Sequence, residues 1–278
     1  MKRQNAINLP IIIGAIANFL LASLKTIIGF IGNSASLFAD GVHSFSDLLT
    51  DALVFLSAKF SSKNKSDDYE YGFQRLETIA TLFIGIALIT VSYHLILEAY
   101  KHIFDEQEIS IIGYVLGINI VSLIVKEGLY HYSKHMGEKW DAKILVANAT
   151  HHRSDAAASM VVLIGVLGSI MGFKILDGVA ALVVALLVVY FGLKLIYQSV
   201  CELMDKTVPA KSLKPILVEL NKVHKVKSHR SRVLGNFISL EIKLDIANNV
   251  SYEELIKIKE EMNLIVKGKK VADLTISI

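Results

Sequence analysis

Long apolar segments follow one another through the first 200 residues of the chain, and they constrain its fold more than any other feature. A helix needs about 20 apolar residues to cross a hydrocarbon layer about 30 Å thick, and each segment has roughly that length. Charged residues make up only 20% of the 278 residues and hydrophobic residues 53%, which favours a membrane protein over a soluble domain. We therefore predict an α-helical polytopic membrane protein with a six-transmembrane-helix bundle. The six predicted spans are 10–31, 35–58, 76–100, 109–133, 142–171 and 175–199.

The basic residues of the loops indicate the orientation of this bundle. An even number of spans places both termini on the same side of the membrane. Lysine and arginine precede the first span and follow the second and the fourth, whereas the alternate loops are short or acidic. The positive-inside rule then predicts cytoplasmic N- and C-termini. The short basic N-terminus fits a cell membrane (the inner or plasma membrane). The basic residues are Lys2, Arg3, Lys59, Lys63, Lys65, Arg75, Lys134 and Lys139.

The last part of the chain has the pattern of a small water-exposed domain. Apolar and polar residues alternate over 237–246, which is typical of a half-buried β-strand. The resulting order α-β-β-α-β predicts a ferredoxin-like α+β domain at 205–278, after a membrane domain at 1–204. A domain of about 70 residues is only marginally stable alone, so we expect this one to dimerise. The other predicted elements are helices at 211–223 and 251–266 and strands at 226–233 and 271–278.

Ionisable side chains recur at helical spacing inside the second and fifth spans. His43 and Asp47 are four residues apart and therefore share one helix face, and His151 and Asp155 repeat that spacing. Each ionisable group at bilayer depth costs roughly 2.5–3.5 kcal/mol, so we expect these groups to share a site. Two imidazoles and two carboxylates would suit a tetrahedral Zn²⁺ ion. The alternative is a purely structural polar network.

Other polar residues near these pairs have more than one interpretation. Asp40 and Asp51 can form a vestibule that attracts cations, or they can simply face a water-filled cavity. His152 can compete with His151 as a ligand, because it lies three residues before Asp155. The four-residue spacing seen in the second span favours His151.

Three further charged residues lie within or next to the spans. Lys126 and Glu127 in the fourth span can pair with each other and lock the bundle. Asp177 is expected to be a helix N-terminal residue at the start of the sixth span.

The cysteine content and the net charge exclude other kinds of site. The single cysteine, Cys201, excludes an intramolecular disulfide and a cysteine-based metal cluster. A net charge of +3 is too small to indicate nucleic-acid binding.

Two sequence motifs resemble signatures of the cation diffusion facilitator family. Residues 34–47, SASLFADGVHSFSD, are similar to its second-helix signature, and residues 149–156, ATHHRSDA, to its fifth-helix signature. The resemblance extends over nearly the whole chain. It implies a homodimeric secondary transporter that exports divalent metal ions from the cytoplasm in exchange for protons. It also implies no enzymatic activity, no organic cofactor and no nucleic-acid partner.

The ligand set of this family distinguishes its branches. The version with two histidines and two aspartates resembles the zinc-selective branch, so Zn²⁺ is the expected substrate. Fe²⁺, Mn²⁺, Co²⁺ and Cd²⁺ remain alternative substrates. The ligands implied by the resemblance are His43, Asp47, His151 and Asp155.

The chain departs from the family pattern in two places. The loop after the second span reads YEYGF at residues 69–73, so the histidines of the common H-P-Y-G-H accessory motif are missing. The histidines that bind regulatory metal in the C-terminal domain of many relatives are replaced by Lys227, Glu241 and Ser277. These replacements argue against a metal-sensing role for this domain.

Other classes of protein could also place histidine and aspartate at bilayer depth. An intramembrane metallohydrolase would need an open zinc coordination position and a general base, and the chain contains no H-E-x-x-H motif. A non-transporting scaffold would not need all four ligand positions intact. A passive channel would differ from a carrier in lacking saturable flux that depends on a pH gradient.

Overall fold

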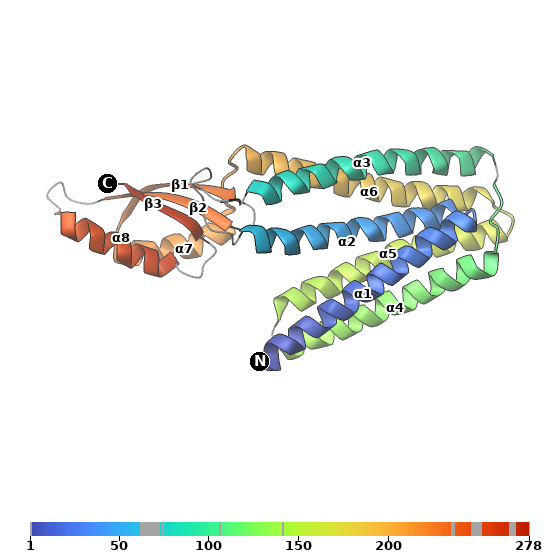
Figure 1. The fold of residues 1–278 in the computed structure, drawn as a ribbon, viewed down its shortest axis with the longest axis horizontal. Coiled ribbons are helices and arrows are strands. Elements are labelled where there is room, and N and C mark those ends of the chain that lie inside the picture. Colours follow the sequence, from blue (N-terminus) through green and yellow to red (C-terminus); the bar gives the residue numbers. More distant parts are fainter. Residues whose placement is uncertain are drawn as a thin grey trace. The chain divides into compact units, whose positions relative to one another are not determined.

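The predicted helices and strands are present in the computed structural model, which describes residues 2–61, 73, 75–105, 107–140, 142–234, 237–245, 252–266 and 271–277. In these residues, six long helices come first, and two shorter helices and three strands follow (Figure 1). The long helices are α1 (Lys2–Ile31), α2 (Ala35–Ser61), α3 (Arg75–Phe104), α4 (Ile112–Lys139), α5 (Lys143–Ile170) and α6 (Ile175–Leu203). The later elements are α7 (Ala210–Val223), β1 (Val226–Leu234), β2 (Phe237–Leu244), α8 (Tyr252–Val266) and β3 (Val271–Ser277).

The chain forms two compact units, and α2, α3 and α6 each contribute residues to both. The predicted domain limits, 1–204 and 205–278, follow chain order and stay a prediction. We call the first unit the helical unit and the second the mixed unit. The helical unit comprises Met1–Ala52 and Ile84–Lys194, and the mixed unit comprises Leu53–Phe83 and Leu195–Ile278.

Five of the described helices are long and apolar enough to cross a membrane: α1 from Asn8 onward, α3, α4, α5 from Leu145 onward, and α6. Their outer surfaces expose large apolar side chains such as Ile124 and Ile164, which are 65% and 61% exposed. Apolar surface of this extent is expected against lipid rather than water. The helices are those of an integral membrane protein.

The helix α2 differs from these five. It has 27 residues, about 40 Å at 1.5 Å per residue, which is long enough to span a bilayer. Its apolar sequence is interrupted by Asp40, Asp47 and Asp51. The predicted count of six spans therefore stays a prediction.

Close helix contacts hold the helical unit together. The helices α1, α4 and α5 lie side by side (Figure 1). The backbone of α1 approaches that of α2 at two glycines: a Cβ atom at Gly29 would lie 2.5 Å from the backbone nitrogen of Phe38, and one at Gly41 would lie 2.6 Å from that of Thr26. Only a residue without a side chain permits this separation, so these glycines place the polar face of α2 close to α1.

The mixed unit contains a three-stranded sheet in the order β1-β2-β3. The strands β1 and β2 are antiparallel, whereas β2 and β3 are parallel and are joined through α8. Both α7 and α8 lie on one side of the sheet and bury an apolar core against it (Figure 1). The core includes Leu213, Ile216, Leu220, Leu240, Ile242, Leu244, Met262, Val266 and Leu274.

The predicted order α-β-β-α-β is confirmed, and so is the alternation in the second strand, with one exception. Leu240, Ile242 and Leu244 are buried, while Glu241 and Lys243 are exposed. Ser239 was predicted to be on the polar, open face, yet it is only 3% exposed. It lies on the central strand opposite Arg232 and Asp273, and its side chain is too short to extend past theirs, unlike the long side chains of Glu241 and Lys243. The finer ferredoxin-like label stays a prediction.

Candidate metal site

Two helices of the helical unit bring three of the predicted ligands together. His43 and Asp47 lie one turn apart on α2, and Asp155 lies on α5. One ligand atom from each of these three side chains lies within 4.8 Å of those of the other two. His43 Nε2 is 3.8 Å from Asp47 Oδ2. Small side-chain movements would bring such atoms to the bond lengths of about 2.0–2.2 Å that Zn²⁺ adopts with nitrogen and oxygen ligands.

The surroundings of this group restrict its side chains. His43 is 4% exposed and Asp155 is 3% exposed, so both lie inside the unit. The His43 ring stacks on the ring of Phe191 from α6, with centroids 5.6 Å apart and an interplanar angle of 18°. Stacking and burial together limit the rotation of the imidazole, which keeps its nitrogen near the two carboxylates.

His151, the fourth predicted ligand, lies beside this group but not within it. It is one turn before Asp155 on α5, and its Nδ1 atom is 3.8 Å from Asp155 Oδ1. Its side chain is 38% exposed, which leaves room for the ring to turn. The structure thus brings three of the four predicted side chains together and leaves the fourth adjacent.

Lys126 is a charged neighbour of the site that the sequence analysis did not connect with it. Its Nζ atom lies 3.3 Å from Asp155 Oδ2, and both side chains are almost fully buried. Glu127 instead has its carboxylate 3.3 Å from the imidazole of the exposed His131. The predicted pair between Lys126 and Glu127 is therefore wrong, because adjacent residues of a helix face different directions.

Asp40, predicted to be either a vestibule residue or a cavity-facing residue, is fully buried. Its Oδ2 atom accepts hydrogen bonds from Lys25 Nζ at 2.7 Å and from Ser159 Oγ at 3.0 Å. Lys25 also donates to Ser159 Oγ at 3.0 Å, so α1, α2 and α5 meet at this ion pair. The vestibule roles stay predictions, and the side chain of Asp51 lies outside the described residues.

His152, the competing ligand candidate, faces another part of the unit. It is 1% exposed, and its Nε2 atom lies 3.2 Å from the Asn148 side-chain amide. A Cβ atom at Gly14 of α1 would lie 3.2 Å from the same ring atom, so the imidazole packs against α1. His151, by contrast, is 38% exposed and lies 3.8 Å from Asp155.

Asp177 supports the start of the helix that carries two of the candidate ligands. It lies in the first turn of α6, as predicted. Its carboxylate accepts hydrogen bonds from the Ala35 backbone at 2.8 Å, from Ser34 Oγ at 2.9 Å, and from Ser36 Oγ. A helix leaves its first backbone N–H groups without internal partners, so this carboxylate caps α2 from another helix.

Comparison with known proteins places this arrangement in a family. The model of the cation efflux transmembrane domain matches residues 11–204, which include all six long helices from Ile11 onward. The chain belongs to the cation diffusion facilitator family of metal transporters.

Three relatives of this cation diffusion facilitator align with most of the chain. An uncharacterized transporter of Methanocaldococcus jannaschii is 32% identical over 249 residues, which are 88% of each chain. The manganese efflux system protein MneP of Bacillus subtilis is 29% identical over 253 residues, 87% of this chain and 85% of MneP. The magnetosome protein MamB of Magnetospirillum gryphiswaldense is 31% identical over 242 residues, 86% of this chain and 81% of MamB.

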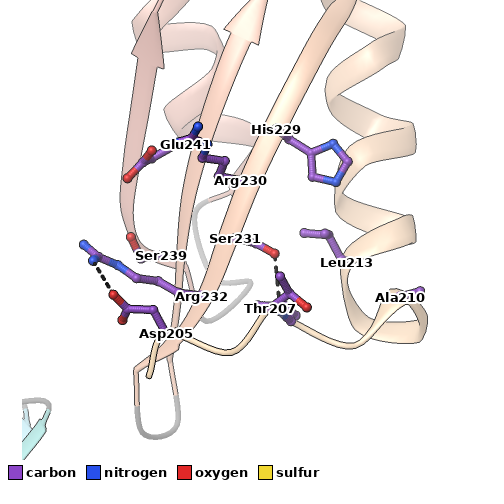
Figure 2. A pocket seen from close by; sticks show the side chains of 11 residues that line it. Asp205, Thr207, Ala210, Leu213, His229, Arg230, Ser231, Arg232, Ser239 and Glu241 are labelled. Carbon is purple, nitrogen blue, oxygen red and sulfur yellow. Dashed lines mark hydrogen bonds and ion pairs between the residues drawn. The ribbon is translucent and has the colours of Figure 1, made fainter. Parts of the chain in front are cut away.

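The mixed unit of this cation diffusion facilitator contains a polar pocket of about 700 Å³ beside β1. At its rim the Asp205 carboxylate accepts a hydrogen bond from Arg75 and lies 3.5 Å from Arg232 Nη1. The hydrogen bond from Arg75 and the positive charge of both arginines lower the pKa of Asp205 below its ordinary value of 3.8. Figure 2 shows two groups of side chains on opposite sides of the sheet: Arg232, Ser239 and Glu241, and Leu213, His229 and Ser231.

The described residues of this region do not bring three metal-binding side chains together. His229 lines the pocket and is exposed, while His224 lies 3.4 Å from Glu261. Lys227 and Glu241, at two of the positions where relatives have histidine, are exposed. The expectation that this region does not sense metal stays a prediction.

Proposed function

We propose that this cation diffusion facilitator is a secondary transporter that exports Zn²⁺ from the cytoplasm in exchange for protons and works as a homodimer. One observation carries the proposal: His43, Asp47 and Asp155 approach one another to within 4.8 Å inside a unit built of apolar helices. Bringing a buried carboxylate, Asp155, and a partly buried one, Asp47, together in such a setting is costly unless they share a cation. Family membership supports transport of that cation rather than chemistry upon it.

The proposed substrate follows from the donor atoms. One imidazole and two carboxylates converge, and His151 can supply a second imidazole when its exposed ring turns toward Asp155. Imidazole nitrogen suits Zn²⁺ and its transition-metal neighbours, whereas Ca²⁺ and Mg²⁺ prefer sites made only of oxygen. Four ligands of this kind would complete a tetrahedral zinc site with His43, Asp47, His151 and Asp155.

The proposed mechanism couples metal and proton movement at the same atoms. Metal binding requires a neutral imidazole and ionised carboxylates, so metal and protons compete for the site. Zn²⁺ binds while the site faces the cytoplasm, and protons replace it while the site faces the other side. Rocking of one group of helices against another would change the side to which the site is open.

Mn²⁺ is the second candidate substrate, because one relative is a manganese efflux system protein. Two carboxylates beside one buried imidazole also suit this metal, which accepts more oxygen ligands than Zn²⁺ does. The two candidates differ in the role of His151. A tetrahedral zinc site needs its nitrogen, whereas a manganese site can use water in its place.

Transport by reconstituted protein tests the proposal. Proteoliposomes with an imposed pH gradient are expected to accumulate Zn²⁺ with saturation and to move protons in the opposite direction. His43→Ala and Asp155→Asn should each lower the initial rate at least about a hundredfold, because each removes a metal ligand. His131→Ala is the matched control, since this histidine is 70% exposed and pairs with Glu127 on α4. Undiminished Zn²⁺/proton exchange by either ligand variant would contradict the assigned site.

The two neighbouring histidines of α5 provide a sharper comparison. His151→Ala should reduce Zn²⁺ transport more than His152→Ala, because His151 Nδ1 lies 3.8 Å from Asp155 whereas His152 packs against Asn148 and α1. If Mn²⁺ is the substrate, Mn²⁺ transport should survive His151→Ala. Measuring both metals with both variants separates the zinc assignment from the manganese assignment.

A further inference from the structure

A lysine from α4 reaches the proposed metal site and holds one of its ligands. Lys126 Nζ lies 3.3 Å from Asp155 Oδ2, and the side chains are 1% and 4% exposed. Asp155 is also one of the three residues whose ligand atoms converge. The same carboxylate therefore faces the ammonium group of Lys126 and the position where a cation would bind.

This contact opposes the binding of a metal ion for a simple electrostatic reason. Two positive charges that share one carboxylate repel each other, and the repulsion is strong where water is excluded. Asp47 and Asp155 supply two negative charges to the site, and Lys126 cancels one of them. A divalent ion at these ligands must either displace the ammonium group or bind beside it with reduced affinity.

The second buried lysine of the helical unit, Lys25, pairs with a carboxylate that is not one of the proposed ligands. Lys25 lies 2.7 Å from Asp40 and 3.0 Å from Ser159, and neither of these belongs to the converging group. Lys25 and Asp40 thus neutralise each other. Lys126 instead forms its ion pair with Asp155, one of the proposed ligands.

We propose that Lys126 is a tethered internal cation that competes with the transported metal for Asp155. This inference rests on the proposed metal-transport function. Lys126 weakens metal binding and thereby speeds release of the metal. After release it pairs with Asp155 while protons replace the metal at the other ligands, so that the transporter can reorient without an unpaired buried carboxylate.

Zn²⁺ binding and transport by Lys126 variants test this role. Lys126→Met removes the charge and keeps an unbranched apolar side chain of similar length. In calorimetric titrations of the purified full-length protein, its Kd for Zn²⁺ should fall about tenfold or more. In proteoliposomes its KM should also fall, while kcat falls because release becomes slower. A lysine with only a structural role would give the opposite result, since damage to the site raises Kd.

Two further variants complete the experiment. Lys134→Met removes the same charge from the same helix at an exposed position, and it should leave Kd, KM and kcat at their wild-type values. Lys126→Gln keeps a hydrogen-bond donor toward Asp155 and provides the test if Lys126→Met does not fold. An unchanged or higher Kd in a folded, uncharged Lys126 variant would overturn the inference while leaving the proposed function intact. Failure of the wild type to bind or transport Zn²⁺ or Mn²⁺ would instead overturn the proposed function itself.

Discussion

Buried charges at single positions constrain the interior of the helical unit. Lys25 with Asp40 and Lys126 with Asp155 form two ion pairs whose side chains are at most 4% exposed. A buried pair of this kind adds little net stability, because removing both charges from water costs about as much as their attraction returns. Losing one partner is different, since it leaves an uncompensated charge and costs about 3–5 kcal/mol. Such pairs specify which helix faces meet rather than how strongly they bind.

At the same scale, Asp205 allows a prediction about pH. Its folded-state pKa is lowered chiefly by the hydrogen bond from Arg75, so its contribution to stability is present above the ordinary value of 3.8. That contribution is lost as the pH falls below 3.8 and through the lower folded-state pKa. Asp205→Asn should therefore lower the Tm at pH 7, and the difference from wild type should shrink steadily as the pH falls below 3.8. Thermal unfolding in detergent over this pH range measures the effect.

The size of this effect is limited by solvent, because the Asp205 side chain is 47% exposed and its pairs are screened. Arg75→Gln breaks the same hydrogen bond from the donor side. In a double-mutant cycle the two substitutions should therefore be less than additive. Strict additivity, or a Tm difference that persists unchanged at low pH, would show that this interaction does not stabilise the folded state.

At the scale of elements, the position of α2 is determined by contacts at its first half. Asp177 of α6 caps its N-terminus, and Gly29 and Gly41 allow α1 to approach it closely. These contacts are specific enough to hold a helix whose aspartates make it a poor membrane segment by hydropathy alone. The position of His43 and Asp47 relative to Asp155 depends on them.

Gly29→Ala tests the contribution of this close approach. The new Cβ atom would lie 2.5 Å from the Phe38 nitrogen, so α1 and α2 must separate. We expect a loss of about 1–3 kcal/mol in stability, together with weaker Zn²⁺ binding. Gly117→Ala is the matched control on α4, where a Cβ atom meets nothing within 4 Å, and it should be neutral or slightly stabilising. Thermal unfolding and Zn²⁺ titration measure the two effects. Equal Tm and Kd values for Gly29→Ala and Gly117→Ala would contradict the expectation.

At the scale of the whole molecule, the sides of the membrane on which the two termini lie depend on the number of spans. Five of the described helices are long and apolar enough to cross a membrane, and α2 is a sixth long helix with a more polar sequence. With six spans the two termini share one side of the membrane, and with five they lie on opposite sides. The proposed cytoplasmic location of both termini thus requires that α2 crosses the bilayer.

Labelling of single cysteines with an impermeant maleimide decides between these topologies. With Cys201→Ser as the background, Gln4→Cys and Ser212→Cys should both react in inverted membrane vesicles and not in intact cells. Ser110→Cys, in the exposed segment between α3 and α4, should show the reverse pattern. Reaction of Gln4→Cys and Ser212→Cys from opposite sides would contradict the six-span arrangement.

Local pattern sufficed to predict the order and approximate limits of the helices and strands. The lengths of the apolar segments predicted the six long helices, and the alternation around Leu240 predicted the central strand with its buried face. The four-residue spacing of His43 and Asp47 likewise placed both on one helix face, because the period of a helix is a property of the backbone. These conclusions need no knowledge of the neighbouring elements.

The partners of the buried charges could not be obtained in this way. In the sequence Lys126 could pair with its neighbour Glu127, but the structure pairs it with Asp155, and it pairs Asp40 with Lys25. Such contacts depend on how far each helix is rotated about its axis and how it is shifted along its neighbour. Packing of side chains from several helices determines both quantities, so only the tertiary structure revealed a lysine at the proposed metal site.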